Sequence, residues 1–256
     1  MTLQNPIFFY ANLLKSYTPT VTSEASGYPK GNLYDDDLNS MWKATSTAEQ
    51  SINIDAGAAV PVDVFCLGPV HNLKTADAEL SLQYSSTGAW AGEQTVVFTL
   101  TPSADNVYDH RLFTQVSARY WRIVLASLAA TPQIGEIAFG ARYTLPKYFA
   151  EGFDDRNRVL TKTVNTSDGG QREKIVFHRR RTFPCTMTPI TVGAQAETDF
   201  FTWRDAVEDG TPFWFLYDVG NDYETVFVSL IDTEFNAPIS LGLSRQNITF
   251  KLEEEL

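Results

Sequence analysis

Short runs in which apolar and polar residues alternate dominate the first half of the chain. Ser51–Gly57 and Glu79–Tyr84 alternate residue by residue, so that Leu80, Leu82 and Tyr84 share one face. A period of two is typical of a β-strand with one buried side. Turn residues end each run, and the pattern therefore predicts an antiparallel sandwich or barrel. The predicted strands cover residues 51–57, 62–67, 79–84, 95–100, 119–125 and 134–139.

The second half has a different order of elements. Strands at 159–164 and 174–178 flank the turn Ser167–Gly170, which predicts a hairpin. One helix follows at about 195–208, because its apolar residues recur at spacings of four, three and four. The residues on that apolar face are Ala196, Phe200, Trp203 and Val207. Further strands are predicted at 213–217, 225–231 and 247–252.

A domain boundary is expected near residues 140–150, where the last strand of the first set gives way to Pro146. We therefore expect a mainly β protein with two domains. Residues 1–143 form a β-sandwich, and residues 144–256 form a β-barrel or sandwich with one packed helix. The apolar start of the chain contains Pro6 and has no basic residue before Lys15. We interpret it as a structured arm and not as a signal peptide.

Composition and charge narrow the range of partners. Hydrophobic residues make up 43% and aromatic residues 13% of the chain, which predicts a folded core. The net charge of −11 argues against binding to nucleic acid, which needs clustered positive charge. No run approaches the ~18 apolar residues of a membrane span. The two cysteines, Cys66 and Cys185, cannot build a disulfide framework, and Cys66 is expected to be a buried free thiol in a protein made in a cytoplasm.

Motifs for catalysis are absent from the sequence. The three histidines lie far apart, no metal-ligand spacing occurs, and no phosphate-binding glycine motif or nucleophile motif is present. The pair Asp154–Asp155 lies in a predicted turn and is interpreted as solvated. We therefore expect a protein that is not an enzyme and has no cofactor.

Five stretches of the first half, in order and at suitable spacing, resemble the discoidin, or coagulation factor 5/8 type C, family over about residues 10–142. These stretches are Asn32–Trp42, Ser51–Gly57, Leu82–Trp90, Ala118–Val124 and Ile134–Gly140. The resemblance implies an eight-stranded jelly-roll sandwich, and Trp42 and Trp121 are expected in its interior. It also implies that Arg122 pairs with Asp35 or Asp37.

The same resemblance implies two sites. Carbohydrate-binding members often hold a structural calcium ion, and by position its ligands would be Asp37, Ser40 and Glu136. The sequence departs from the family by having Asp35-Asp36-Asp37 without the central glycine, which puts the calcium in doubt. Glycan binders of the family use exposed aromatic residues in loops at one end of the sandwich. The corresponding ligand-binding residues here would be Tyr28, His71 and Trp90, although a residue at the position of Trp90 more often packs as part of the family's turn.

The stretch Phe200–Tyr217 is similar to the tail-tube-like domain of minor tail proteins of long-tailed bacteriophages. This second resemblance implies a distal tail or baseplate protein of the virion tail, assembled in the host cytoplasm. Copies would form a ring and contact the tube and tip proteins. Arg179, Arg180 and Arg181 would then meet an acidic neighbour, or form a solvated strand end. The alternative is a carbohydrate-binding protein or adhesin, and a host-surface glycan is a partner in both interpretations.

Overall fold

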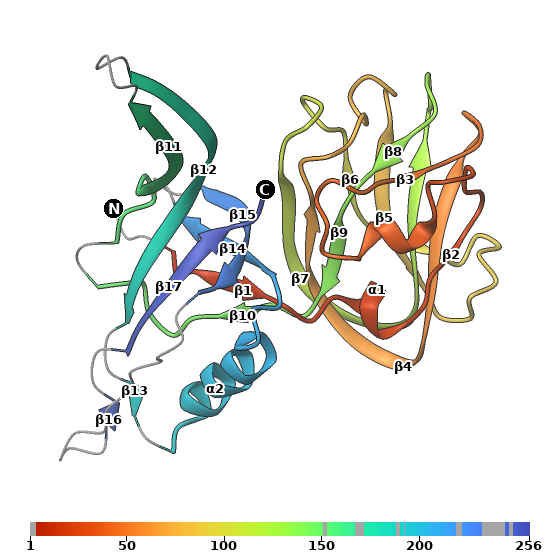
Figure 1. Cartoon of the computed structure of the whole chain (residues 1–256). Helices are drawn as coiled ribbons and strands as arrows, with labels where there is room; N and C mark the ends of the chain where they lie inside the picture. The colour runs from red at the N-terminus through yellow and green to blue at the C-terminus, as the bar shows by residue number, and fades with distance from the viewer. Residues whose placement is uncertain are drawn as a thin grey trace. The chain divides into compact units, whose positions relative to one another are not determined.

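The computed structural model divides into two compact units. It describes residues 4–150, 153–166, 172–187, 190–191, 193–218, 222–231, 244–245 and 248–256. One unit is Phe9–Tyr143, and the other combines Met1–Phe8 with Thr144–Leu256 (Figure 1). The division after residue 143 lies where the sequence suggested it. The first eight residues differ from the expectation, because they belong with the second half of the chain.

The unit Phe9–Tyr143 is built almost entirely of β-strands around one hydrophobic core. Its main sheet has the order β2-β4-β7-β5-β6, with β9 also paired to β4, and β3 pairs with β8. The bounds are β2 (Thr20–Val21), β3 (Trp42–Lys43), β4 (Gln50–Leu67), β5 (Glu79–Ser85), β6 (Thr95–Leu100), β7 (Asp109–Ala126), β8 (Gln133–Ile134) and β9 (Ile137–Gly140). The mainly β fold expected from the alternation is confirmed.

Strands β4 and β7 are much longer than the sequence pattern predicted. Each has 18 residues, and β4 joins the two runs that were predicted as separate strands. The register of their pairing shifts between Asp55 and Val60, where residues of β4 remain unpaired. Such bulges bend a strand, and Figure 1 shows both strands curving around the unit. The first part of β4 therefore pairs with β2 and the second part with β9.

The interior of this unit contains the residues that the sequence placed there. Trp42 and Trp121 are fully buried, and Cys66 is a buried free thiol. Two short helical turns complete the unit, α1 (Leu13–Ser16) and the 3-10 helix η1 (Lys30–Leu33). Asn12 holds α1 in place, because its Oδ1 accepts from the Leu14 amide at 3.1 Å and its Nδ2 donates to the Ile137 carbonyl at 2.9 Å.

The second unit is a seven-stranded sheet with one packed helix. The strand order is β10-β1-β14-β15-β17-β12-β11, and β13 pairs with β16. The bounds are β1 (Ile7–Phe9), β10 (Tyr143–Thr144), β11 (Arg158–Thr166), β12 (Arg172–Met187), β13 (Ile190–Thr191), β14 (Phe213–Asp218), β15 (Tyr223–Leu230), β16 (Ser244–Arg245) and β17 (Ile248–Glu254). The predicted hairpin is present as β11 and β12, and its turn at 167–170 lies outside the described residues.

The predicted helix is α2 (Gln195–Val207), and aromatic contacts fasten it to the sheet. Phe200, Trp203 and Val207 are buried as the spacing predicted. The Trp203 ring stacks on Phe8 of β1 at 4.4 Å between centroids and meets Phe250 of β17 at 5.4 Å. Every side chain of β14 is buried. Neither described helix has the length or apolar character needed to cross a membrane.

The chain leaves and re-enters the second unit at adjacent positions. Strands β1 and β10 are neighbours in the sheet, and the Leu145 amide donates to the Pro6 carbonyl at 2.8 Å. Phe9–Tyr143 is therefore an insertion between β1 and the rest of its sheet.

Candidate functional site

A small polar cavity lies in the unit Phe9–Tyr143, where loops gather beyond the end of β4. Its volume is about 120 Å³. The connection from β4 to β5, the loop between β6 and β7, and strand β8 supply most of its wall. The lining residues are Met41, Val70, His71, Asn72, Asp105, Asn106 and Gln133. Among the aromatic and imidazole residues expected to bind a ligand, His71 is the one that lines it.

His71 forms a rigid part of the cavity wall. Its Nδ1 accepts the Leu73 amide at 3.3 Å, so the ring proton is assigned to Nε2, which donates to the Val107 carbonyl at 3.0 Å. Burial lowers the pKa of His71 below its usual value of 6.5. The imidazole is therefore neutral near pH 7 and both ring nitrogens are already bonded. His71 shapes the cavity and leaves the binding of a ligand to its neighbours.

Asn72 and Asp105 are likewise committed to the loops. The Asn72 side chain accepts a hydrogen bond from the backbone N–H of Gln133 at 2.8 Å and donates one to the Thr131 carbonyl at 3.0 Å. Asp105 accepts the Lys74 amide at 2.7 Å and the Thr75 amide at 3.1 Å. These bonds tie together loops that are distant in the sequence, so the cavity is preformed.

Two side-chain amides remain available for a ligand. The side chains of Asn106 and Gln133 line the cavity and make no hydrogen bond within the described part of the chain. Each amide offers two N–H donors and one carbonyl acceptor. The sequence analysis missed both residues, because a single amide in a loop carries no periodic signal. The adjacency of Gln133 to Asn72 arises only from the fold.

Tyr28 lies beside the same group of residues. It is 41% exposed, and the Lys43 ammonium lies 5.8 Å from the centroid of its ring. The Lys43 amide donates to the Tyr28 carbonyl at 3.5 Å, and Lys43 is the strand partner of Gln133. Strand β3 therefore lies between Tyr28 and β8, and Tyr28 is not among the residues that line the cavity.

Trp90 lies away from this cavity. His71 lies in the segment that leads into β5, and Trp90 in the turn that leads out of it. The seven residues of β5 separate them by roughly 20 Å along the strand. The Trp90 ring packs against the Arg122 guanidinium at 4.4 Å, and its amide donates to Glu93 at 3.1 Å. Of the three expected ligand-binding residues, His71 lines the cavity, Tyr28 lies across strand β3 from it, and Trp90 lies away from both.

The expected ion pair of Arg122 is wrong. Arg122 donates to the Gln83 side chain at 2.7 Å instead of pairing with Asp35 or Asp37. Arg119 is the residue of this strand that forms a bidentate ion pair, with Asp55 at 2.6 and 2.8 Å. The cause is geometric, because Asn53 and Gln83 are the strand partners of Arg122.

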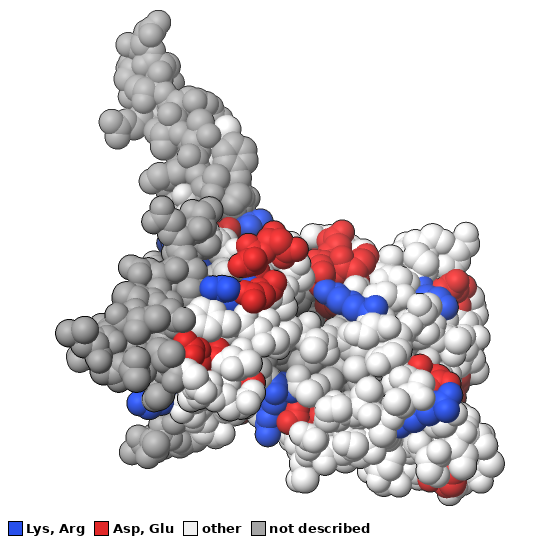
Figure 2. Space-filling view, turned by 90° about the horizontal axis from the view of Figure 1, so that it is seen from below, with Lys and Arg blue, Asp and Glu red and all other residues white. Residues whose placement is uncertain are grey.

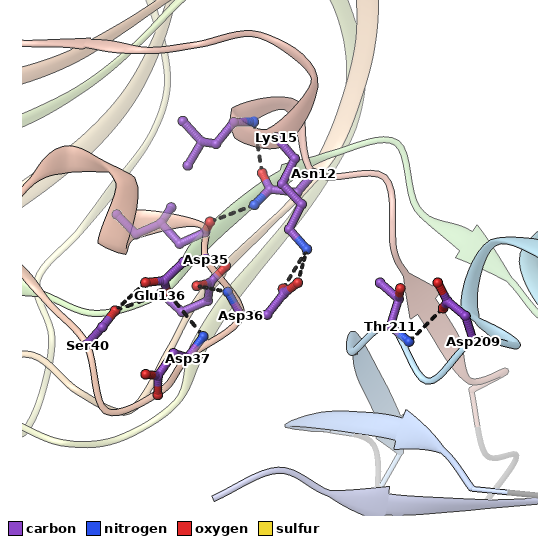
Figure 3. A network of polar contacts seen from close by, with 11 residues as sticks. Asn12, Lys15, Asp35, Asp36, Asp37, Ser40, Glu136, Asp209 and Thr211 are labelled. Atoms are coloured by element: carbon purple, nitrogen blue, oxygen red, sulfur yellow. Dashed lines mark hydrogen bonds and ion pairs between the residues drawn. The ribbon is translucent and has the colours of Figure 1, made fainter.

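The residues expected to bind calcium form a network around a buried carboxyl group (Figure 3). Glu136 is 1% exposed, its Oε2 accepts the Asp36 amide at 3.2 Å, and its Oε1 is buried without a hydrogen-bond partner. Burial, together with the negative charges of Asp36 and Asp35, raises the pKa of Glu136 to about 9. The Ser40 hydroxyl donates to Asp35 at 2.8 Å.

These residues fit an oxygen-binding cation, with one change to the expected set. The unpartnered Oε1 of Glu136, the carboxylate of Asp35 and the hydroxyl of Ser40 are hard oxygen donors of the kind that calcium prefers. The Asp37 carboxylate instead accepts the Asn39 amide at 2.9 Å within its own turn. In the described residues no three His, Cys, Asp or Glu side chains gather into a metal-binding group. A cation would therefore also need backbone carbonyl oxygens.

The missing family glycine also has a visible consequence. Asp36 occupies that position with φ of 65°, the left-handed conformation that glycine adopts most easily. Its carboxylate forms an ion pair with the Lys15 ammonium at 2.5 Å. The turn therefore has a left-handed residue at this position without a glycine.

The three consecutive arginines differ in their surroundings. Arg180 pairs with Glu253 at 2.9 Å, and Arg181 with Glu254 at 2.9 Å, so both bind the last strand of their own sheet. Arg179 is exposed. On the face shown in Figure 2, Lys and Arg lie in small groups beside Asp and Glu, and form no continuous basic patch over the described residues.

A model of a known protein family matches most of the first unit. Residues 18–139, a little under half of the chain, match the model of the F5/8 type C domain. The resemblance to the discoidin family is thereby confirmed for this part of the chain. Comparison with curated proteins gives no match. The resemblance of the second half to tail proteins stays a prediction.

Several solved structures resemble the first unit. A selenomethionine-labelled mutant of chitosan-binding module 1 from a chitosanase/glucanase of Paenibacillus sp. IK-5 is 20% identical, with a TM-score of 0.44, and the match covers 52% of this chain and 99% of that one. A Clostridium perfringens module in complex with GalNAc-β-1,3-galactose is 17% identical, with a TM-score of 0.43 and coverage of 51% and 100%. The family 32 module of C. perfringens NanJ in complex with galactose is 17% identical, with a TM-score of 0.43 and coverage of 54% and 99%.

Proposed function

We propose that the unit Phe9–Tyr143 is a carbohydrate-binding domain, and that the protein acts by binding and not by catalysis. The observation that carries this proposal is the preformed polar cavity with two uncommitted amides, Asn106 and Gln133. Sugar hydroxyls both donate and accept hydrogen bonds, and a side-chain amide can satisfy both needs. Tyr28, across strand β3 from Gln133, offers an exposed ring for the apolar face of a sugar that extends beyond the cavity. The F5/8 type C match agrees with this assignment.

A glycan array followed by calorimetric titration tests the proposal. We expect binding to a subset of glycans, tested with galactose, N-acetylgalactosamine and chitosan oligosaccharides among others. Asn106→Ala or Gln133→Ala removes one or two hydrogen bonds, and each should weaken binding about tenfold, or about 1.4 kcal/mol.

Trp90→Ala is the matched control, because Trp90 lies beyond the opposite end of β5. Tyr28→Ala should weaken binding, whereas Trp90→Ala should leave it unchanged. A blank array, or equal losses in the Trp90 and Gln133 variants, would exclude this cavity as the sugar site.

We also propose that the network around Glu136 holds a calcium ion with a structural role. Asp35, Ser40 and Glu136 would provide side-chain oxygens, and the ion would supply positive charge to a buried carboxyl group. Calcium should raise the melting temperature of the wild-type chain, and Glu136→Gln should abolish that rise. Asp37→Asn is the control, since Asp37 can still cap its turn as asparagine. An equal calcium response in all three proteins would disprove the site.

A structural role in a bacteriophage tail is the second candidate function. The observation that favours it is the second unit, where the stretch similar to tail proteins forms α2 and β14 on a large sheet. In this role copies assemble into a ring in the virion tail, contact tube and tip proteins, and present the first unit to the host surface. Electron microscopy of tails labelled with antibody against this chain tests it, and tails without label at the tip would count against it.

A further inference from the structure

Strand β12 has different neighbours along its two halves. Thr182–Met187 pairs with β17 inside the sheet. Arg172–Arg181 pairs with β11 and, in the described pairings, has no strand on its other side. We call β11 with Arg172–Arg181 the ribbon. Within its unit the ribbon extends beyond the ends of the neighbouring strands (Figure 1). A two-stranded ribbon is only marginally stable in water by itself.

Apolar side chains are exposed on both faces of the ribbon. Val159 is 43% exposed, and Ile175 and Val176 are each 41% exposed. Ile175 and Val176 are consecutive in a strand, so they point to opposite faces. The ribbon thus holds three of the eight large hydrophobic residues found exposed in the described part of the chain. A ribbon with such residues on two sides suits a contact that encloses it.

The charge of the ribbon is opposite to that of the remaining chain. The ribbon contains 7 Lys and Arg against 1 Glu, a net charge of +6. All other residues contain 13 Lys and Arg against 30 Asp and Glu, a net charge of −17. Arg180 and Arg181 bind glutamates of their own sheet, whereas Arg158 and Arg179 are exposed. Basic side chains on the ribbon therefore remain free to meet an acidic partner.

We propose that the ribbon docks onto the acidic surface of a second copy of this chain. Two ribbons would repel each other, because each carries a net charge of +6, so the contact joins the ribbon of one copy to another surface of the next. Unlike surfaces meeting in this way build rings or open chains. The inference deepens the second proposed function and is independent of the sugar site. It is tested on the purified chain away from any tail, so its failure is distinct from the failure of either function.

Light scattering of the full chain over a range of concentrations tests the contact. We expect particles heavier than the 28.6 kDa monomer, with a mass that falls as salt is added. The double variant Arg158→Glu/Arg179→Glu and the triple variant Val159→Ser/Ile175→Ser/Val176→Ser should both be monomeric. Lys74→Glu and Val96→Ser change exposed residues of the other unit, and they should keep the wild-type mass. Circular dichroism establishes that each variant is folded.

Mixing wild-type and variant chains distinguishes a contact between a ribbon and an acidic surface from a contact between two ribbons. The Arg158→Glu/Arg179→Glu variant cannot donate a ribbon but keeps its acidic surface, so adding it to wild-type chains should lower their mean mass. A mass unchanged by mixing overturns the proposal. A monomeric wild type, or an oligomer that the ribbon variants leave intact, also overturns it. An oligomer that nuclease dissolves overturns it as well, because nucleic acid would then bridge the copies.

Discussion

At the scale of single residues, the lining of the cavity is of two kinds: supports, which hold the loops in place, and contacts, which are available to a ligand. His71, Asn72 and Asp105 use their polar atoms to hold the loops, whereas Asn106 and Gln133 keep theirs for a ligand. A residue chosen from the sequence as a ligand contact, His71, is thus a support. Substitutions of supports should lower stability, whereas Gln133→Ala should lower affinity alone.

His71 should make the stability of the first unit depend on pH. Its folded-state pKa lies below 6.5, mainly because of burial. Below pH 6.5 the unfolded chain takes up a proton that the folded chain refuses, so stability present above that pH is lost as the pH falls toward the folded-state pKa. Urea unfolding on either side of this pH measures the loss. His71→Asn should show a smaller loss, and equal losses in both proteins would contradict this role.

Gly140 should not tolerate a side chain. A Cβ atom there would lie 2.5 Å from the Ala11 carbonyl oxygen and 3.1 Å from the Phe9 ring. Backbone cannot move aside cheaply, so Gly140→Ala should cost about 1–3 kcal/mol of unfolding free energy. Gly31→Ala is the control, because a Cβ there meets nothing within 4 Å. Thermal unfolding measures both, and equal stabilities would show that the chain relaxes around residue 140.

At the scale of elements, period-two alternation predicted the strands well, because one face of each strand packs on the core. The same pattern gave no warning that β4 is continuous, since its bulged residues 56–59 lose the alternation that would have joined the two runs. It also gave no sign that Ile7 and Phe8 belong with the second unit. The run Ile7–Phe9 is apolar throughout, and its pairing with β14 depends on residues some 200 positions away.

The helix was predicted correctly because its buried residues lie within one short window. The cavity was not, because Asn106 and Gln133 come from separate loops that only the folded chain brings together. Of the expected ligand residues, Tyr28 and His71 lie near the cavity, and Trp90 instead supports Arg122. Sequence reasoning named one residue of the cavity wall, His71, but not the two amides that line it.

Helix α2 should stabilise the second unit without affecting the first. Trp203 is fully buried between Phe8, Phe213 and Phe250. Trp203→Ala should lower the unfolding free energy of the second unit by about 3–5 kcal/mol. Phe201→Ala, which removes a half-buried ring lying over Arg204, should cost much less. Hydrogen exchange should show lost protection in β14 and β17 and unchanged protection in β4 and β7. Loss of protection in all four strands would mean that the two units unfold together.

At the scale of the whole molecule, binding and self-association should reinforce each other. Joined copies present several sugar sites at once, and the second binding event then becomes intramolecular. On a densely glycosylated surface, wild-type protein should therefore be retained far longer than the Val159→Ser/Ile175→Ser/Val176→Ser variant. On a sparsely glycosylated surface, the two proteins should be retained equally long. Surface plasmon resonance at the two densities measures the difference. Equal retention at both densities would show that association does not bring sugar sites together.

The insertion of the first unit between β1 and β10 has a consequence for how such proteins diversify. The polypeptide leaves the seven-stranded sheet after β1 and returns to it at the neighbouring strand β10. A domain inserted between two adjacent strands can be exchanged for one of different shape while the hydrogen bonds of that sheet stay intact. One scaffold can in this way acquire new recognition properties through the replacement of a single continuous cassette.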